Sequence, residues 1–219
     1  MDRPILKKEQ VKTLIETRFI KVADLQYNEM GHYYSVSRRP CGSVPLMAEE
    51  EFKNMISDAV TCIVIVKRHG DEPKLLLTKE FRYPVGQFLL SPPAGLIDQE
   101  DRETESPVIS AAKREIEEET GLAVKETDLI YVVNPLCFSS PGMTDESNAL
   151  ACAVVDADEG FEFNSDHTES VERIGDYALF SREDALRVLE QGRDDEGIFY
   201  SVYTFIALIY FVSGLWKEA

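Results

Sequence analysis

Apolar residues gather in short runs along this chain, and turn residues separate the runs. The most apolar run lies within residues 57–67, where every position from Ala59 to Val66 except Thr61 is hydrophobic, and this pattern is typical of a central strand with both faces buried. Residues 74–79 follow a turn that contains Gly70 and Pro73, so they predict the return strand of a hairpin. Similar runs predict further strands at residues 87–91, 122–136, 147–155 and 171–179, with an extension at residues 160–163.

A helix is predicted among these strands, at residues 107–120. Ser106 offers an N-cap, Pro107 fits the first helical position, and Gly121 fits the left-handed position that ends a helix. The apolar residues that would face the core are Val108, Ala111, Ala112 and Ile116. Just before this helix, residues 92–95 predict a turn and the acidic residues 96–105 predict a loop.

Two more helices are predicted in the last part of the sequence. Ser181 caps the first, which ends at Gly192. The second lies within residues 198–216, which carry no charge and approach the length of a membrane span. Its tyrosine, serine and threonine residues make this stretch less hydrophobic than a typical membrane span. We therefore expect a helix buried against the body of the protein or a second subunit, and no membrane partner.

The N-terminal part has a different pattern. Residues 5–15 predict a short amphipathic helix, and residues 17–39 predict a β-hairpin with its turn at residues 28–31. We expect an N-terminal arm at residues 1–50 and a second domain at residues 51–219. Many strands around one embedded helix, followed by helices, predict an α+β fold, an α/β/α sandwich around a mixed β-sheet.

Charge and cysteine content narrow the classes of function. The formal net charge of the 219 residues is -17, which argues against nucleic-acid polymers, because phosphate backbones are bound by clusters of Lys and Arg. A small anionic substrate stays open, since a bound metal can invert the local field. The four cysteines are scattered and no targeting segment is visible, so we expect reduced thiols, no zinc site and a cytoplasmic protein.

The strongest chemical signal is an acidic cluster near the end of the embedded helix. Glu115, Glu118 and Glu119 stand at i, i+3 and i+4 and share one helix face, where like charges repel. A hard divalent cation would reverse this repulsion, because Mg²⁺ and Mn²⁺ take oxygen ligands. We expect these three carboxylates and the Ala94 carbonyl to hold Mg²⁺ or Mn²⁺. Arg114 would pair with a neighbouring carboxylate.

Residues 93–122 resemble the Nudix box, whose pattern is G-x5-E-x7-R-E-U-x-E-E-x-G-U, with U an aliphatic residue. The part from Arg114 to Leu122 matches every fixed position. The distance from Gly95 to Arg114 is five residues longer than the pattern, and Ser106 stands where counting back from Arg114 requires a glutamate. The resemblance implies a Nudix-type sandwich and metal-dependent cleavage of a diphosphate, with Glu118 catalytic as well as metal-binding.

Three further segments resemble the ADP-ribose pyrophosphatase branch of the Nudix hydrolases. They are EFRYP at residues 80–84, PAGLID at residues 93–98 and SPGMTDE at residues 140–146. The resemblance implies hydrolysis of ADP-ribose to AMP and ribose 5-phosphate. It implies substrate contacts from Arg82, Leu96, Pro141 and Glu146.

The same resemblance implies a general base on a late loop and a dimer. Glu169 is the first choice for the base, Glu172 the second and His167 the third. The N-terminal hairpin would exchange between the subunits of a homodimer. Phe19 and Tyr33 would then enclose an adenine, and Arg38 would reach a phosphate.

Several alternatives stay open at this stage. The substrate could be another nucleotide sugar, such as GDP-mannose, or a dinucleotide. A non-catalytic Nudix-fold protein could sense a nucleotide without cleaving it, although such a sensor needs no full set of metal-binding carboxylates. The acidic cluster could also serve only as an interaction face.

Overall fold

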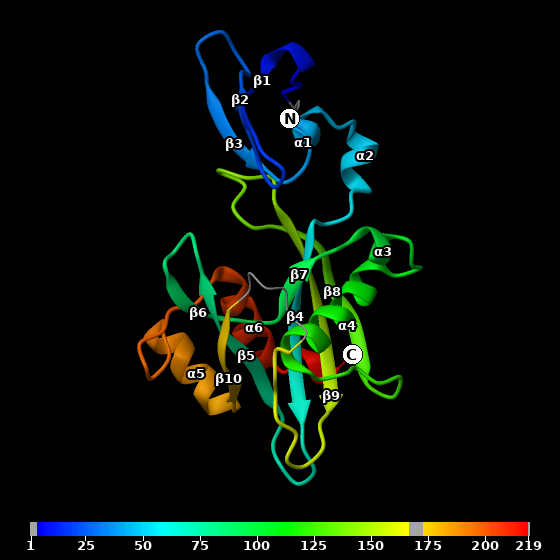
Figure 1. Ribbon diagram of the computed structural model, residues 1–219, viewed down its shortest axis with the longest axis vertical. Coiled ribbons are helices and arrows are strands. Elements are labelled where there is room, and N and C mark those ends of the chain that lie inside the picture. The colour runs from blue at the N-terminus through cyan, green and yellow to red at the C-terminus, as the bar shows by residue number, and fades with distance from the viewer. Residues whose placement is uncertain (1–3, 167–172, 219) are drawn as a thin grey trace. The chain divides into compact units, whose positions relative to one another are not determined.

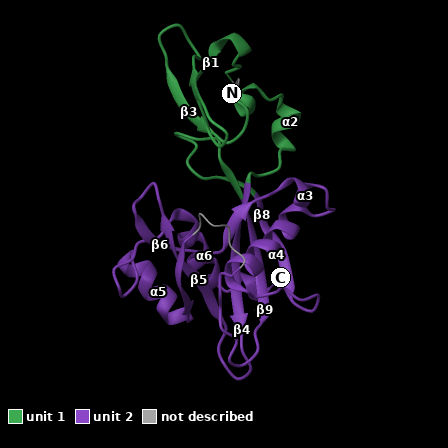
Figure 2. Ribbon diagram, in the orientation of Figure 1, with its two compact units in different colours: residues 1–58, 136–148 green, residues 59–135, 149–219 purple. Residues whose placement is uncertain are grey.

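The computed structural model describes residues 4–166 and 173–218 (Figure 1). The chain forms two compact units (Figure 2). Unit 1 contains Met1–Asp58 and Leu136–Asn148, and unit 2 contains Ala59–Pro135 and Ala149–Ala219. The predicted functional division after residue 50 stays a prediction.

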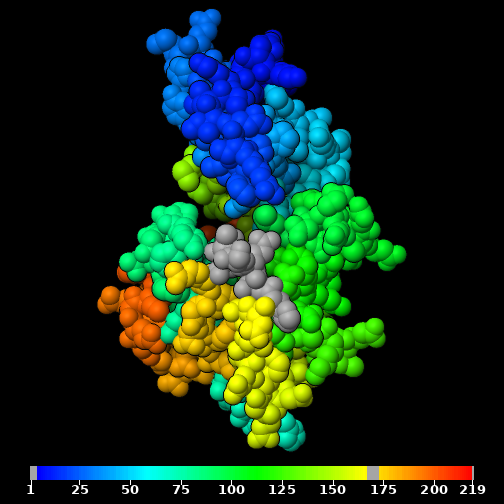
Figure 3. Space-filling view, viewed as in Figure 1, coloured from blue at the N-terminus to red at the C-terminus, as the bar shows by residue number. Residues whose placement is uncertain are grey.

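Unit 1 is built on a small antiparallel sheet with the strand order β1-β2-β3. These strands are β1 (Val11–Glu16), β2 (Lys21–Leu25) and β3 (Tyr33–Ser37); η1 (Lys8–Gln10) precedes them, and α1 (Ser43–Leu46) and α2 (Glu49–Lys53) follow. Leu6, Ala23 and Leu25 form a small core against which Leu46 of α1 packs. The space-filling view shows the strands, in blue, lying against α1 and α2, in cyan (Figure 3).

The predicted N-terminal hairpin is confirmed, but the predicted helix at residues 5–15 is wrong. Only η1 is helical there, and Val11 pairs with Leu25 across the sheet. Val11, Thr13 and Ile15 are β-branched, which favours the extended backbone once β2 supplies a partner strand.

The described residues of the second sheet form seven strands. Its main order is β10-β5-β4-β9-β8, while β6 pairs with β5 and β7 pairs with β4. The strands are β4 (Ala59–Lys67), β5 (Lys74–Arg82), β6 (Gln87–Ser91), β7 (Ala94–Leu96), β8 (Leu129–Phe138), β9 (Ser147–Asp156) and β10 (Ile174–Phe180). The helices of unit 2 are α3 (Gln99–Arg102), α4 (Pro107–Thr120), α5 (Arg182–Gln191), α6 (Val202–Ser213) and η2 (Leu215–Lys217).

Strand β4 divides the core of unit 2 into two layers, because its side chains alternate between the faces of the sheet. Val60 and Val64 belong to the cluster that contains Ile116 of α4. Ile63 and Ile65 belong to the other cluster, whose helical members are Ala185, Val188, Ala207, Leu208 and Phe211. Helices therefore cover both faces, which confirms the predicted mixed α+β sandwich.

The predicted ends of α4 and α5 are also confirmed. Ser106 is the N-cap residue of α4, with Pro107 in its first turn, and Ser181 accepts a hydrogen bond from the Asp184 backbone N–H at the start of α5. Gly121 and Gly192 end these helices with φ of 70° and 71°. In the described part of the chain, no helix is long and apolar enough to cross a membrane, and α6 spans 12 residues.

Four predictions about short segments of unit 2 are wrong in detail. Residues 94 and 95, predicted in a turn, and residue 96, predicted in a loop, pair with β4 as strand β7, and the predicted loop contains the short helix α3. Residues 160–163 form no strand, and β8 begins only at Leu129. Short elements such as these depend on partners that are remote in sequence, so local pattern does not identify them.

The left-handed glycine that ends α4 yields a stability prediction. Gly121→Ala adds a Cβ that would lie 2.5 Å from the side-chain Nδ2 of Asn164, whereas a Cβ at Gly192 would meet no atom within 4 Å. Both substitutions cost about 1–2 kcal/mol for the left-handed backbone, so Gly192→Ala is the matched control. We expect urea unfolding to show a larger decrease in the free energy of unfolding for Gly121→Ala than for Gly192→Ala. Equal decreases in the free energy of unfolding for the two variants would mean that the Asn164 side chain moves aside freely.

Candidate active site

The acidic residues of α4 differ sharply in exposure. Glu115 and Glu119 are 6% and 4% exposed, and Glu118 is partly exposed. Glu117, between them in sequence, is exposed to solvent. The helix therefore turns Glu115, Glu118 and Glu119 toward the protein and Glu117 away from it. Burial of two carboxylates is costly unless a cation or hydrogen-bond donors compensate it.

Strand β7 brings a glycine directly against this cluster. Gly95 pairs with Val60 of β4, and a Cβ at position 95 would overlap the Glu115 carboxylate. Any side chain at this position would displace Glu115. The close approach of strand and helix is thus the physical reason for glycine here.

Arg114 joins this cluster through both of its terminal nitrogens. Its Nη1 donates to Glu115 Oε1 at 2.8 Å and to Glu118 Oε2 at 3.0 Å. Its Nη2 donates to the Leu96 carbonyl at 2.8 Å and to Asp101 Oδ2 at 2.9 Å. Burial opposes the charge of Arg114, but Asp101 and the two glutamates raise its pKa above the ordinary value. The predicted pairing of Arg114 with a neighbouring carboxylate is confirmed.

Asp101 is the site residue that our sequence analysis missed. Its side chain is 5% exposed, and besides Arg114 it accepts hydrogen bonds from Ser110 Oγ at 2.8 Å and the Asp98 N–H at 3.1 Å. Burial opposes its ionisation, yet these hydrogen bonds hold the pKa of Asp101 below the ordinary value. The signal was available in the sequence: Asp101 lies six residues after Gly95, where the box pattern has its first glutamate.

The five extra residues of the box therefore lie between Asp101 and Arg114. The α3 helix carries Asp101, and α4 carries Arg114, so the added length lies in the connection and first turn that precede Arg114. The ion pair between them shows that the extra residues do not separate the two halves of the motif.

The position of the carboxylates on α4 is electrostatically unfavourable. Glu118 and Glu119 lie in the last turn, at the negative end of the helix dipole, and no basic residue lies in that turn. Arg114 is the cation that the described ion pairs bring to Glu115 and Glu118. Additional positive charge at this helix end would be stabilising.

The chemistry of these donors fits a hard divalent cation. Glu115, Glu118 and Glu119 offer carboxylate oxygens, and Ala94, next to Gly95, offers a carbonyl oxygen. Among residues 4–166 and 173–218, no three His, Cys, Asp or Glu side chains are already arranged to hold a metal ion. Arg114 contacts Glu115 and Glu118 in this arrangement, so a metal ion would compete with it for the more exposed Glu118.

The predicted substrate-binding residues of unit 2 lie at the ends of two strands, Leu96 on β7, which contacts α4, and Arg82 on β5. Arg82 Nη2, at the end of β5, lies 2.6 Å from Glu80 Oε2, and the Arg82 side chain is 43% exposed. The Leu96 side chain is exposed, and its carbonyl binds Arg114. Arg82 is therefore accessible to an anion that could displace Glu80.

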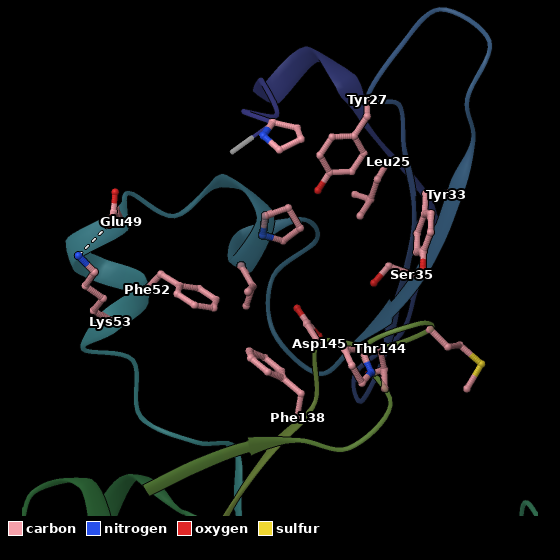
Figure 4. A pocket seen from close by; sticks show the side chains of 15 residues that line it. Leu25, Tyr27, Tyr33, Ser35, Glu49, Phe52, Lys53, Phe138, Thr144 and Asp145 are labelled. Carbon is pink, nitrogen blue, oxygen red and sulfur yellow. Dashed lines mark ion pairs between the residues drawn. The ribbon is translucent and has the colours of Figure 1, made fainter. Parts of the chain in front are cut away.

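The predicted residues of unit 1 meet where β3 contacts the loop at residues 139–146. Tyr33 donates its hydroxyl to the Gly142 carbonyl at 3.0 Å, and Arg38 Nε lies 2.8 Å from Glu146 Oε1. Tyr33 and Pro141 line a cavity of about 1100 Å³ whose walls are largely apolar (Figure 4).

Phe19 does not join that group. It is 69% exposed and lies just before Lys21, which pairs with Ser37, whereas Tyr33 pairs with Leu25 at the other end of the hairpin. One chain therefore does not bring Phe19 and Tyr33 together around a ring. The predicted exchange between subunits stays a prediction.

The three candidate bases, His167, Glu169 and Glu172, lie outside the described residues. Their catalytic assignment stays a prediction.

This chain is similar to known proteins and to solved structures. A family model described as the NUDIX domain matches residues 55–201. The chain is 36% identical over 120 residues to a putative Nudix hydrolase 2 of Caenorhabditis elegans, a match that covers 53% of this chain and 50% of that protein. It is 38% identical over 101 residues to an ADP-ribose pyrophosphatase of Saccharomyces cerevisiae, covering 45% of this chain and 39% of the other.

A mouse (Mus musculus) ADP-sugar pyrophosphatase is 31% identical over 107 residues, which cover 49% of this chain and 45% of the mouse protein. The chain thus spans half or less of the length of these relatives. A crystal structure described as an ADP compounds hydrolase aligns with 95% of this chain and 91% of its own, with a TM-score of 0.55 and 16% identity, and it shares the fold. The NUDIX model covers well over half of the sequence, and the chain belongs to the Nudix family.

Proposed function

We propose that this protein hydrolyses the diphosphate bond of a nucleoside diphosphate sugar in a Mg²⁺-dependent reaction. The favoured substrate is ADP-ribose, which would give AMP and ribose 5-phosphate. The observation that carries the proposal is the cluster of partly and fully buried carboxylates on α4. Arg114 holds the cluster, and Gly95 of β7 lies directly against it. Family membership and the pyrophosphatase names of the yeast and mouse relatives support it.

The residues of the cluster divide into proposed cation ligands and one residue that positions them. Glu115, Glu118, Glu119 and the Ala94 carbonyl would hold the cation, which when bound neutralises charge on phosphoryl oxygens and makes water a better nucleophile. Arg114 fixes the carboxylates and ties them to Asp101 and Leu96.

The hydrolysis itself needs one water molecule and one base. The water oxygen bonds to one phosphorus while the bond from that phosphorus to the bridging oxygen breaks. The proton of the water goes to the base, for which Glu169 is our first choice, and the bridging oxygen leaves with the other phosphate.

Cationic side chains and aromatic rings would hold the substrate. We propose that Arg82 and Arg38 contact phosphate oxygens, which would compete with their present partners Glu80 and Glu146. Phe19 and Tyr33, from the two subunits of a homodimer, would contact the base. The homodimer and the cytoplasmic location stay predictions from the sequence.

A substrate panel tests the proposal directly. The protein is incubated with Mg²⁺ and ADP-ribose, GDP-mannose, other nucleotide sugars or dinucleotides, and release of the nucleoside monophosphate is followed. Preferential release of AMP from ADP-ribose supports the favoured substrate, and preference for another diphosphate supports the alternative hydrolase. Nucleotide binding without turnover of any diphosphate would replace the enzyme with a sensor.

The metal assignment predicts a specific effect of neutralising two carboxylates. In Glu118→Gln/Glu119→Gln the ligands lose their negative charge, so we expect activity to fall at least about 100-fold, as for the loss of an essential electrostatic group. Stabilisation by Mg²⁺ in thermal unfolding should disappear as well. Glu117→Gln on the exposed side of the same helix is the matched control and should keep both properties. Full activity in the double variant would refute the assignment.

The link between Asp101 and Arg114 predicts a pH-dependent change in stability. Asp101→Asn removes a buried charge-assisted ion pair, so we expect the free energy of unfolding at pH 7 to fall by about 1.5–3 kcal/mol. Because the folded pKa of Asp101 is lowered, its contribution is present above the unfolded value of about 3.9 and is lost as the pH falls through the folded value.

Denaturant titrations from pH 7 to pH 3 measure this difference. The difference in stability between Asp101→Asn and the unmodified protein should narrow toward the acid end. Glu100→Gln, at an exposed position of the same short helix, should follow the unmodified protein throughout. A pH-independent difference would show that Asp101 acts by packing and not by its charge.

A further inference from the structure

The carbonyl groups at the end of α4 are bound by residues from elsewhere in unit 2. The last carbonyls of a helix have no partner within the helix. Here the Glu117 carbonyl accepts from the Gly121 N–H at 2.8 Å, which closes the helix. The Tyr177 hydroxyl donates to the Glu119 carbonyl at 2.8 Å, and the Asn164 N–H donates to the Thr120 carbonyl at 3.1 Å.

Tyr177 is itself firmly held. It belongs to β10 and pairs with Thr78 of β5, and its ring packs against Phe163 with 5.6 Å between ring centroids. Burial raises the pKa of Tyr177, so the hydroxyl stays protonated and donates throughout the neutral range. A residue held by strand pairing and ring packing therefore donates to the peptide group of a proposed metal ligand.

This support opposes two forces that act on the last turn of α4. Glu115, Glu118 and Glu119 repel one another, and the helix dipole disfavours carboxylates at this end. Both forces favour fraying of the turn that carries Glu118 and Glu119. A hydrogen bond to the Glu119 carbonyl costs the site no ligand, because it uses the backbone and leaves the carboxylate to the metal.

We propose that Tyr177 is a positioning residue that holds the end of α4 in its metal-binding conformation. The inference rests on the proposed function, since it assigns Tyr177 to the same metal site. If the turn frays without the hydroxyl, only a fraction of molecules is competent to bind, and the apparent metal affinity falls to that fraction of its intrinsic value.

The test is Tyr177→Phe, which removes the hydroxyl and keeps the ring. We expect the Mg²⁺ concentration at half-saturation to rise by up to about fivefold, the limit set by losing one hydrogen bond of average strength. It is measured as the Mg²⁺-dependent rise in melting temperature and by calorimetric titration, neither of which needs turnover. At saturating Mg²⁺, kcat and the KM for ADP-ribose should return to the values of the unmodified protein.

Tyr210→Phe is the matched control. It removes the hydroxyl that lies 3.0 Å from the Tyr131 hydroxyl, and Tyr210 packs with the core cluster on the other face of the sheet from α4. It should lower the melting temperature without changing the Mg²⁺ midpoint.

The outcomes separate this inference from the proposed function. An unchanged Mg²⁺ midpoint in Tyr177→Phe, or an equal shift in Tyr210→Phe, would overturn the role of Tyr177 while leaving the hydrolase intact. An unmodified protein that neither binds Mg²⁺ nor cleaves any diphosphate would overturn both. A shift confined to Tyr177→Phe supports the inference.

Discussion

The local structure of unit 2 depends on holding several carboxylates together near the C-terminal end of α4, where the helix dipole disfavours negative charge. Glu115, Glu118 and Glu119 gain nothing from the dipole of α4 and repel one another. The neighbouring features compensate for this cost: one arginine between two glutamates, a glycine strand that admits a carboxylate, and donors that bind the last carbonyls. The carboxylate cluster lowers the stability of the folded protein, and a helix with a purely structural role would not need it.

The rest of unit 2 provides the rigidity that this cost demands. Ala111 and Ala112 of α4 are fully buried among the even-numbered residues of β4, and small side chains let the helix lie close to the sheet. The other face of β4 is filled from α5 and α6. The strand beneath the site is therefore packed on both sides, and movement of α4 would open a core that is close-packed.

The sequence predicted the elements whose signals are local, and it missed those that depend on distant partners. Caps and apolar spacing identified α4 and α5 almost to the residue, because these signals act within one or two helical turns. Strand β7 and helix α3 were missed because three or four residues carry no periodicity. Asp101 was missed because the motif was counted back from Arg114 across the extra residues, whereas counting forward from Gly95 reaches it.

The composition of unit 1 constrains how the protein can be divided. It is built from two separate stretches, and β3 binds residues of the second stretch through Val36 N–H to Met143 O at 2.9 Å and Ser37 Oγ to Asp145 Oδ2 at 2.9 Å. Deleting the first 58 residues would therefore strip the loop between β8 and β9 of its hydrogen-bonding partners. A shortened protein intended to isolate unit 2 would need that loop replaced by a tight turn as well.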